Sequence, residues 1–144
     1  MTRYEILLAT DGSQWGHKAE IAAMKIARSY EIRMAAIYVA VARKDSAREE
    51  LVAKGEEVLN SVVEMGAGMG IQVDKILVGV SMHHMPKRGA CAESIAKAIL
   101  DAAGKYKVHT IVLGSKGESE INPEIGSVAL EVVKKTKCTV LVAR

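Results

Sequence analysis

The stretch HTIVLGSKGESEINPEIGSVALEVVKKTKCTVLVA, residues 109–143, decides the fold. It opens and closes with short runs rich in Val, Ile and Leu, at 109–115 and 138–143, which are typical of buried strands. Between them, over 124–135, apolar residues recur at helical spacing. A strand, a helix and a strand in this order form a right-handed crossover between two parallel strands. The stretch therefore predicts a strand–helix–strand unit.

The same alternation extends through the rest of the chain. Further strands are predicted at 4–10, 32–41 and 72–80, and further helices from residue 11 or 13 to about 30, at 46–70 and at 92–106. The strands are apolar at both odd and even positions, as expected when helices cover both faces of a sheet. We therefore predict one α/β domain over residues 1–144, with an open five-stranded parallel sheet of the Rossmann-like type.

The composition narrows the classes of partner. Of 144 residues, 49% are hydrophobic and 26% charged, which suits one globular domain. No apolar run approaches the roughly 18 residues that span a bilayer, and Asp11 interrupts the N-terminal apolar run. We expect no membrane partner and a cytoplasmic location. A net charge of +3 with 3% aromatic residues predicts no nucleic-acid surface. Cys91 and Cys138 are expected to be independent reduced thiols.

Three segments are candidates for ligand contact. In open parallel sheets, ligands bind beyond the carboxyl ends of the strands, where the strand order reverses. That rule selects Thr10–Asp11, Val39–Val41 and the residues from Leu113 onwards. Asp11 has two compatible interpretations, since its carboxylate can cap the first helix or contact a ribose.

Glycines follow the fourth predicted strand, at Gly114, Gly117 and Gly126, the last of them followed by Ser127. Glycines let backbone N–H groups approach an anion closely, and a helix N-terminus adds partial positive charge. An ordinary strand-to-helix turn explains the same residues, because glycine is common in turns. The pattern is not a Walker A motif, because no Gly-Lys-Ser/Thr follows the spaced glycine.

Taken together, four segments resemble the universal stress protein family, and the resemblance spans nearly the whole chain. They are ILLATDGS (6–13), AAIYVAV (35–41), TIVLGSKG (110–117) and GSVALEVVKKTKCTVLVAR (126–144). Nucleotide-binding members of that family place Gly, two residues, Gly, nine residues, then Gly-Ser or Gly-Thr. Here eight residues separate the second and third glycines, one fewer than in the family pattern.

The resemblance implies an adenine-nucleotide α-hydrolase-like fold that binds ATP, with Mg²⁺ as a possible companion, as a regulatory ligand. It also implies a homodimer formed through the C-terminal strand, 138–143. The implied contacts are Ala9, Thr10 and Asp11 for adenine and ribose, Val39 for the base, Leu113, Gly114, Lys116 and Gly117 for ribose and phosphates, and Gly126, Ser127 and Val128 for the distal phosphates. Ala129 stands where a hydroxyl residue is often found, so one phosphate contact is expected to be missing.

The loop before the last helix departs from the family pattern. It carries Glu118, Glu120 and Glu124, which would oppose a phosphate unless they face solvent or Mg²⁺ offsets them. Asn122 and Pro123 resemble an N-cap and a first helical residue, which predicts that the helix begins before Gly126.

These departures keep two other functions open. One is a family member that has lost nucleotide binding and acts through dimerisation and partner contacts. The other is a nucleotide-dependent enzyme of a related adenine-binding superfamily. No catalytic residues can be identified from spacing, so at most slow ATP hydrolysis is expected.

A final stretch, SMHHMPKRGAC (81–91), gathers His, Met and Cys, the ligands of soft metals. Adjacent histidines are poorly placed to hold one ion, and no zinc spacing is present, so we predict a loop and no metal site. Lys87 and Arg88 could reach a phosphate from this loop. His17 and His109 are expected to be structural.

Overall fold

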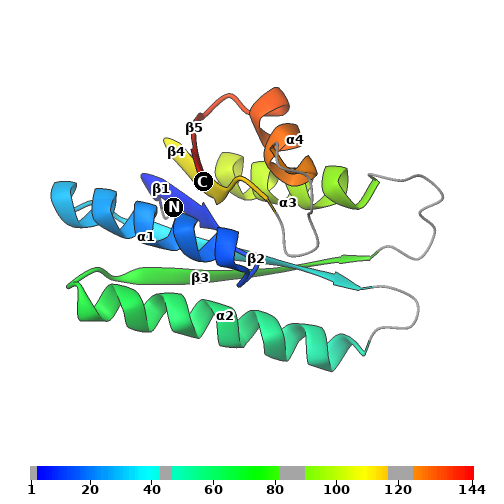
Figure 1. Ribbon diagram of the computed structural model, residues 1–144, viewed down its shortest axis with the longest axis horizontal. Helices are drawn as coiled ribbons and strands as arrows, with labels where there is room; N and C mark the ends of the chain where they lie inside the picture. Colours follow the sequence, from blue (N-terminus) through cyan, green and yellow to red (C-terminus); the bar gives the residue numbers. More distant parts are fainter. Residues whose placement is uncertain (1–2, 43–46, 82–89, 117–124) are drawn as a thin grey trace.

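The computed structural model describes residues 3–42, 47–81, 90–116 and 125–144, in which strands and helices alternate (Figure 1). The elements are β1 (Ile6–Ala9), α1 (Gln14–Tyr30), β2 (Met34–Ala42), α2 (Arg48–Gly68), β3 (Val73–Ser81), α3 (Ala90–Lys105), β4 (Thr110–Gly114), α4 (Ser127–Lys135) and β5 (Thr139–Ala143). The predicted α/β fold with a five-stranded parallel sheet is confirmed.

The strand order is β3-β2-β1-β4-β5, so the chain starts at the centre of the sheet. It moves outward through β2 and β3, then crosses to the other side of β1 for β4 and β5. The strand order reverses between β1 and β4, which makes their carboxyl ends the expected ligand position. Ala9, the last residue of β1, lies in register with Ile37 of β2 and Leu113 of β4.

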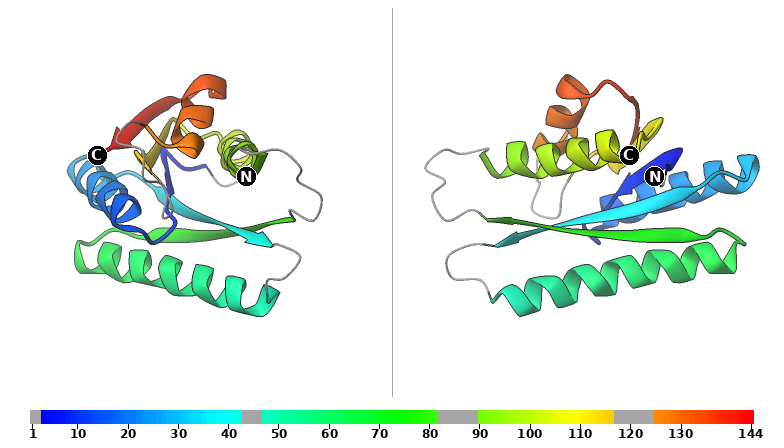
Figure 2. Two further views of the ribbon diagram at one scale, coloured as in Figure 1. Left: turned by 45° about the vertical axis from the view of Figure 1, so that its right-hand side comes forward. Right: turned by 180° about the vertical axis from the view of Figure 1, so that it is seen from behind.

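Two helical layers cover the sheet, and each has its own apolar core. Ile6 and Leu8 face the core formed with α1 and α2, whereas Leu7 and Ala9 face the core formed with α3 and α4. Figure 2 shows α2 on one side of the β2–β3 ribbon and α3 with α4 on the other. Because alternate side chains of β1 are buried on opposite faces, its sequence is continuously apolar.

The last helix begins later than the sequence predicts. Gly126 has an extended backbone (φ −72°, ψ 163°) and is the N-cap, and α4 starts at Ser127. The prediction that the helix begins before Gly126 is therefore wrong, although Ser127 does lie in the first helical turn. Asn122 and Pro123, on which that expectation rested, lie outside the described residues.

A polar cluster closes the amino end of the sheet. The Tyr4 hydroxyl donates a hydrogen bond to the Asp74 carboxylate, and the Tyr4 ring packs edge-on against Tyr106. Burial, followed by the hydrogen bond to Asp74, raises the pKa of Tyr4 to about 12. In the described ranges, no helix is both long and apolar enough to cross a membrane.

Candidate functional site

The candidate site lies where β1 and β4 end side by side. Ala9 and Leu113 are the paired residues at this edge, and both are buried. The chain leaves β1 through residues 10–13, which lead into α1, and leaves β4 through Gly114. The structure thus brings the first and third predicted contact segments together at the reversal of strand order.

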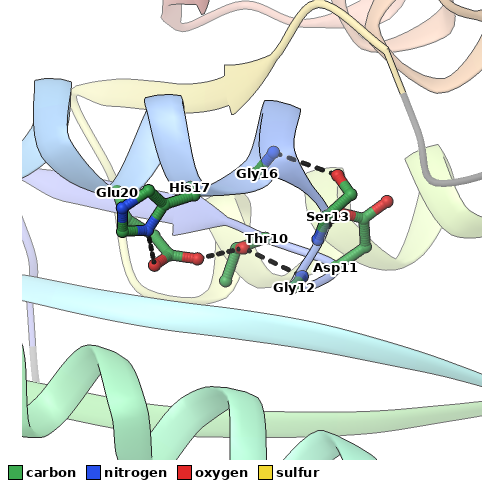
Figure 3. Close-up of polar contacts among 7 residues, drawn as sticks. All are labelled: Thr10, Asp11, Gly12, Ser13, Gly16, His17 and Glu20. Atoms are coloured by element: carbon green, nitrogen blue, oxygen red, sulfur yellow. Dashed lines mark hydrogen bonds and ion pairs between the residues drawn. The ribbon is translucent and has the colours of Figure 1, made fainter.

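Backbone-to-side-chain hydrogen bonds shape the 10–13 loop (Figure 3). Asp11 Oδ1 accepts from the Ser13 amide at 3.0 Å, and Ser13 Oγ accepts from the Gly16 amide at 3.1 Å. Ser13 is therefore the N-cap of α1, and the Asp11 carboxylate folds back on its own loop. Gly12, with φ +80°, occupies the left-handed region that favours glycine.

Thr10 turns its side chain into the protein. Its hydroxyl donates to Glu20 Oε2 at 2.6 Å and accepts from the Gly12 amide at 3.3 Å, and the residue is 6% exposed. Only the backbone of Thr10 is left to contact a ligand. Sequence reasoning missed Glu20, although a carboxylate on the apolar stripe of α1, in line with Ala23 and Ala27, was a detectable signal.

Val39 was selected for its place near the carboxyl end of its strand, but it lies inside β2, which continues to Ala42. Because β1 is much shorter than β2, β2 projects beyond the end of β1 (Figure 1). The Thr10 amide donates to the Ile37 carbonyl at 3.2 Å at the end of β1. Since backbone groups alternate in direction along a strand, Val39 aims its N–H and C=O the same way as Ile37, past the end of β1. An adenine edge needs such a donor and acceptor.

The end of β4 packs closely against the start of α1. A Cβ on Gly114 would lie 2.6 Å from the Trp15 carbonyl oxygen, so glycine is required here for packing alone. Lys116 places its ammonium 4.6 Å from the centre of the Trp15 ring, and Lys18 places its own at 4.8 Å. A tryptophan face attracts such cations. Sequence reasoning did not detect that Trp15 holds the lysine predicted to meet phosphate.

Ser115 joins three elements through its backbone. Its amide donates to the Ala143 carbonyl at the end of β5 at 2.8 Å, and its carbonyl accepts from the Gly126 amide at 2.5 Å. The N-terminus of α4 is thereby held beside the end of β4. Gly126 and Ser127 thus lie close to the glycine end of β4, as their predicted common role requires.

The N-terminus of α4 offers amides to an anion. The Leu130 amide donates to the Gly126 carbonyl, so Ser127, Val128 and Ala129 precede the first bond of the helical ladder. The positive end of the helix dipole lies at the same place. Ala129 is 2% exposed and belongs to the core, so its position carries no polar group.

Several predicted features lie outside the described residues: Gly117, the three glutamates of the following loop, and residues 82–89. Over the part of the chain that the structure describes, no group of three His, Cys, Asp or Glu side chains could hold a metal ion. His17 contacts Glu20 through Nδ1 at 3.3 Å, and His109 contacts Thr110 Oγ1 at 2.8 Å.

Among the described residues, two hollows lie away from this edge of the sheet. One, of about 450 Å³, is at the amino end and is lined by residues that include Arg33 and Asp74. The other, of about 430 Å³, lies between β3 and α3, against Ile76 and Val78. Neither hollow is lined by Gly114, Gly126 or the first residues of α4, so neither belongs to the candidate site.

Comparison with known proteins gives a family match and a relative that is similar over most of the chain. The model of the universal stress protein family matches residues 90–144, from α3 to the C-terminus. Universal stress protein MJ0531 of Methanocaldococcus jannaschii is 29% identical over 97% of this chain and 81% of its own length. The resemblance to the universal stress protein family is confirmed.

Solved universal stress proteins share the fold. A family member from Burkholderia pseudomallei is 26% identical, with a TM-score of 0.69 over 96% of this chain and 95% of its own. The universal stress protein of Archaeoglobus fulgidus in complex with dAMP is 17% identical, with a TM-score of 0.70 over the full length of both chains. Two further universal stress protein structures, one with cAMP and one from Arabidopsis thaliana with AMP, have TM-scores of 0.71 and 0.66.

Proposed function

We propose that this chain binds an adenine nucleotide, ATP with Mg²⁺, as a regulatory ligand at the carboxyl ends of β1, β2 and β4. The observation that carries the proposal is the shortness of β1. Where β1 stops, the Thr10 amide binds the Ile37 carbonyl, so the backbone of Val39 extends beyond the end of β1, where the Asp11 loop begins. On the other side of β1, Ser115 holds the start of α4 beside the end of β4. A backbone donor and acceptor suit the base, a carboxylate suits the ribose, and a helix N-terminus suits the phosphate chain.

Each group has a role set by its chemistry. The Val39 backbone pairs with the adenine edge, and the Asp11 carboxylate accepts a ribose hydroxyl while keeping its bond to Ser13. The amides at the start of α4 and the Ser127 hydroxyl receive phosphate oxygens. Lys116 leaves the Trp15 ring to pair with phosphate. In the same proposal, the site is lined by Ala9, Thr10, Leu113, Gly114, Gly117, Gly126 and Val128.

The relatives support the ligand class. Solved structures with this fold include complexes with cAMP, dAMP and AMP, and all three ligands contain adenine. The described residues contain no carboxylate cluster for a metal ion, so Mg²⁺ in this proposal is carried chiefly by the phosphates of ATP.

Calorimetry tests the proposal. Mg-ATP and AMP are titrated into the parent, Asp11→Ala and the control Asp101→Ala, which removes an exposed carboxylate of α3. We expect micromolar binding of Mg-ATP by the parent, about tenfold weaker binding by Asp11→Ala, and no change in the control. Tighter binding of ATP than of AMP would report the contribution of the added phosphates. A parent that binds no nucleotide at millimolar concentration would refute the proposal.

A second candidate function is dimerisation without nucleotide, and one observation favours it. Leu130 and Val133 on α4 are 43% and 46% exposed, beside the edge strand β5. An apolar edge strand is a ready surface for pairing with a second copy. We propose a homodimer through this edge in either case, built from one domain spanning residues 1–144. Analytical ultracentrifugation of the parent and Val133→Lys tests it, because a dimer should dissociate in the variant.

The candidates predict different responses to ATP. A nucleotide-binding protein should show a thermal shift with Mg-ATP, whereas a purely dimeric family member should show none. A nucleotide-dependent enzyme should release phosphate at a rate that a second substrate raises. We expect at most slow release.

A further inference from the structure

Glu20 is a buried carboxylate that the proposed site does not use directly. It is 4% exposed and lies on the face of α1 that packs against the sheet, with Ala23, Met24 and Ala27. A buried carboxylate is costly unless hydrogen bonds compensate it, whereas an aliphatic residue would fit this stripe freely. The position therefore needs an explanation other than packing.

Both Glu20 oxygens have partners (Figure 3). Oε2 accepts the Thr10 hydroxyl hydrogen at 2.6 Å, and Oε1 lies 3.3 Å from His17 Nδ1. The His17 side chain is 57% exposed, so it covers the carboxylate on the solvent side. Oε2 of Glu20 therefore serves as the acceptor for Thr10, the first residue after β1.

Gly16, one helical turn before Glu20, shapes the same contact. A Cβ on Gly16 would lie 2.6 Å from Thr10 Oγ1 and 2.9 Å from Asp11 Oδ1. Glycine in a helix and a carboxylate in a core stripe are each unfavourable locally. Here both occur one turn apart, and both are explained by the Thr10 side chain. Local rules are most often broken together where function requires it.

We propose that Glu20 is a positioning residue of the nucleotide site, an inference that rests on the proposed function. By taking the Thr10 hydroxyl hydrogen, Glu20 turns the hydroxyl lone pairs toward the loop, where one accepts from the Gly12 amide. This bond holds residues 10–13 in the conformation that presents Asp11 to the ligand. A preorganised loop binds more tightly because less of the protein must rearrange.

Two substitutions at one position separate this role from packing. Glu20→Leu keeps the bulk but removes the acceptor, and Glu20→Gln keeps an acceptor oxygen for the Thr10 hydroxyl. We expect Mg-ATP to bind Glu20→Leu about tenfold more weakly, as when the competent fraction of the loop falls to about a tenth. Glu20→Gln should stay within about threefold of the parent, which a purely charge-based role would not allow.

A double-mutant cycle tests whether Glu20 acts through Thr10. If it does, Glu20→Leu combined with Thr10→Val should bind nucleotide no more weakly than Thr10→Val alone. Additive losses would overturn the inference, because they would show that Glu20 affects the site by another route.

Amide hydrogen exchange provides a measurement that needs no nucleotide. The Gly12 amide should exchange faster in Glu20→Leu than in the parent, and at the parental rate in Glu20→Gln. Unchanged Gly12 exchange in Glu20→Leu would overturn the inference. So would faster exchange with unchanged nucleotide affinity, because loop order would then not serve the site. A parent that binds no nucleotide refutes the proposed function instead, and faster exchange would then leave Glu20 only as the residue that orders the loop.

Discussion

Replacing Gly16 by alanine tests the close approach of α1 to the loop after β1. The new methyl group would lie 2.6 Å from Thr10 Oγ1 and 2.9 Å from Asp11 Oδ1, closer than carbon and oxygen normally come. Forcing a methyl group into such a contact costs about 1–3 kcal/mol. Displacing Thr10 would also deprive the buried Glu20 carboxylate of a donor, at a cost of about 1–3 kcal/mol.

Helix propensity works in the opposite direction. Alanine is more favourable than glycine in a helix by up to about 1 kcal/mol. A Cβ on Gly104, near the end of α3, would meet no atom within 4 Å. Gly104→Ala therefore gains the helix-propensity advantage of alanine without a clash. We expect the free energy of unfolding to fall by about 3 kcal/mol in Gly16→Ala and to rise by about 0.5–1 kcal/mol in the control.

Urea unfolding followed by circular dichroism measures both variants. The midpoint should fall for Gly16→Ala and rise for Gly104→Ala, with the slope unchanged, since a change confined to stability leaves the slope constant. If Gly16→Ala were as stable as Gly104→Ala, the loop would accommodate the methyl group. Gly16 and Glu20 would then not act together to fix the Thr10 side chain.

Three further outcomes are expected. Leu59→Ala should lower the free energy of unfolding by about 2–5 kcal/mol because Leu59 is fully buried, whereas Val52→Ala, on the exposed side of α2, should change it by less than about 0.5 kcal/mol in urea unfolding. The pKa of Tyr4 is raised from 10.0 to about 12, so its contribution to stability is complete below pH 10 and lost as the pH rises towards 12; thermal unfolding of Tyr4→Phe should lack this loss. Emission from Trp15, the sole tryptophan, should change when Mg-ATP draws Lys116 away, and should not respond in this way in Lys116→Ala.

The fold was predictable because its signals are local and periodic. Alternating apolar strands and amphipathic helices predicted all five strands in order, with ends within a few residues of those in the structure. The start of α4 was mispredicted because Asn122 and Pro123 read as a cap in sequence, whereas the structure places the cap at Gly126. Local chemistry alone cannot choose between two possible caps.

The sequence predicted which segments lie together at the candidate site, but not most of the contacts within it. Val39 was selected because it lies near the carboxyl end predicted for its strand, whereas β2 continues to Ala42 and the neighbouring strand β1 ends first. The direction of the Thr10 hydroxyl depends on Glu20, ten residues away, and the seat of Lys116 depends on Trp15, about a hundred residues away. Such contacts follow from the packing of α1 on the sheet, which no short window of sequence contains.

One peptide segment connects the proposed nucleotide site with the proposed dimer edge. The Ser115 amide donates to the Ala143 carbonyl at the end of β5, and the Ser115 carbonyl accepts from the Gly126 amide at the start of α4. A ligand that draws Gly126 toward itself therefore pulls on the residue that anchors Ala143. If nucleotide binding and pairing of β5 both occur, each must alter the affinity of the other by the same factor, because coupling between two binding equilibria is reciprocal. Ser115, the residue between them, is uncharged, and its two backbone hydrogen bonds alone provide this connection.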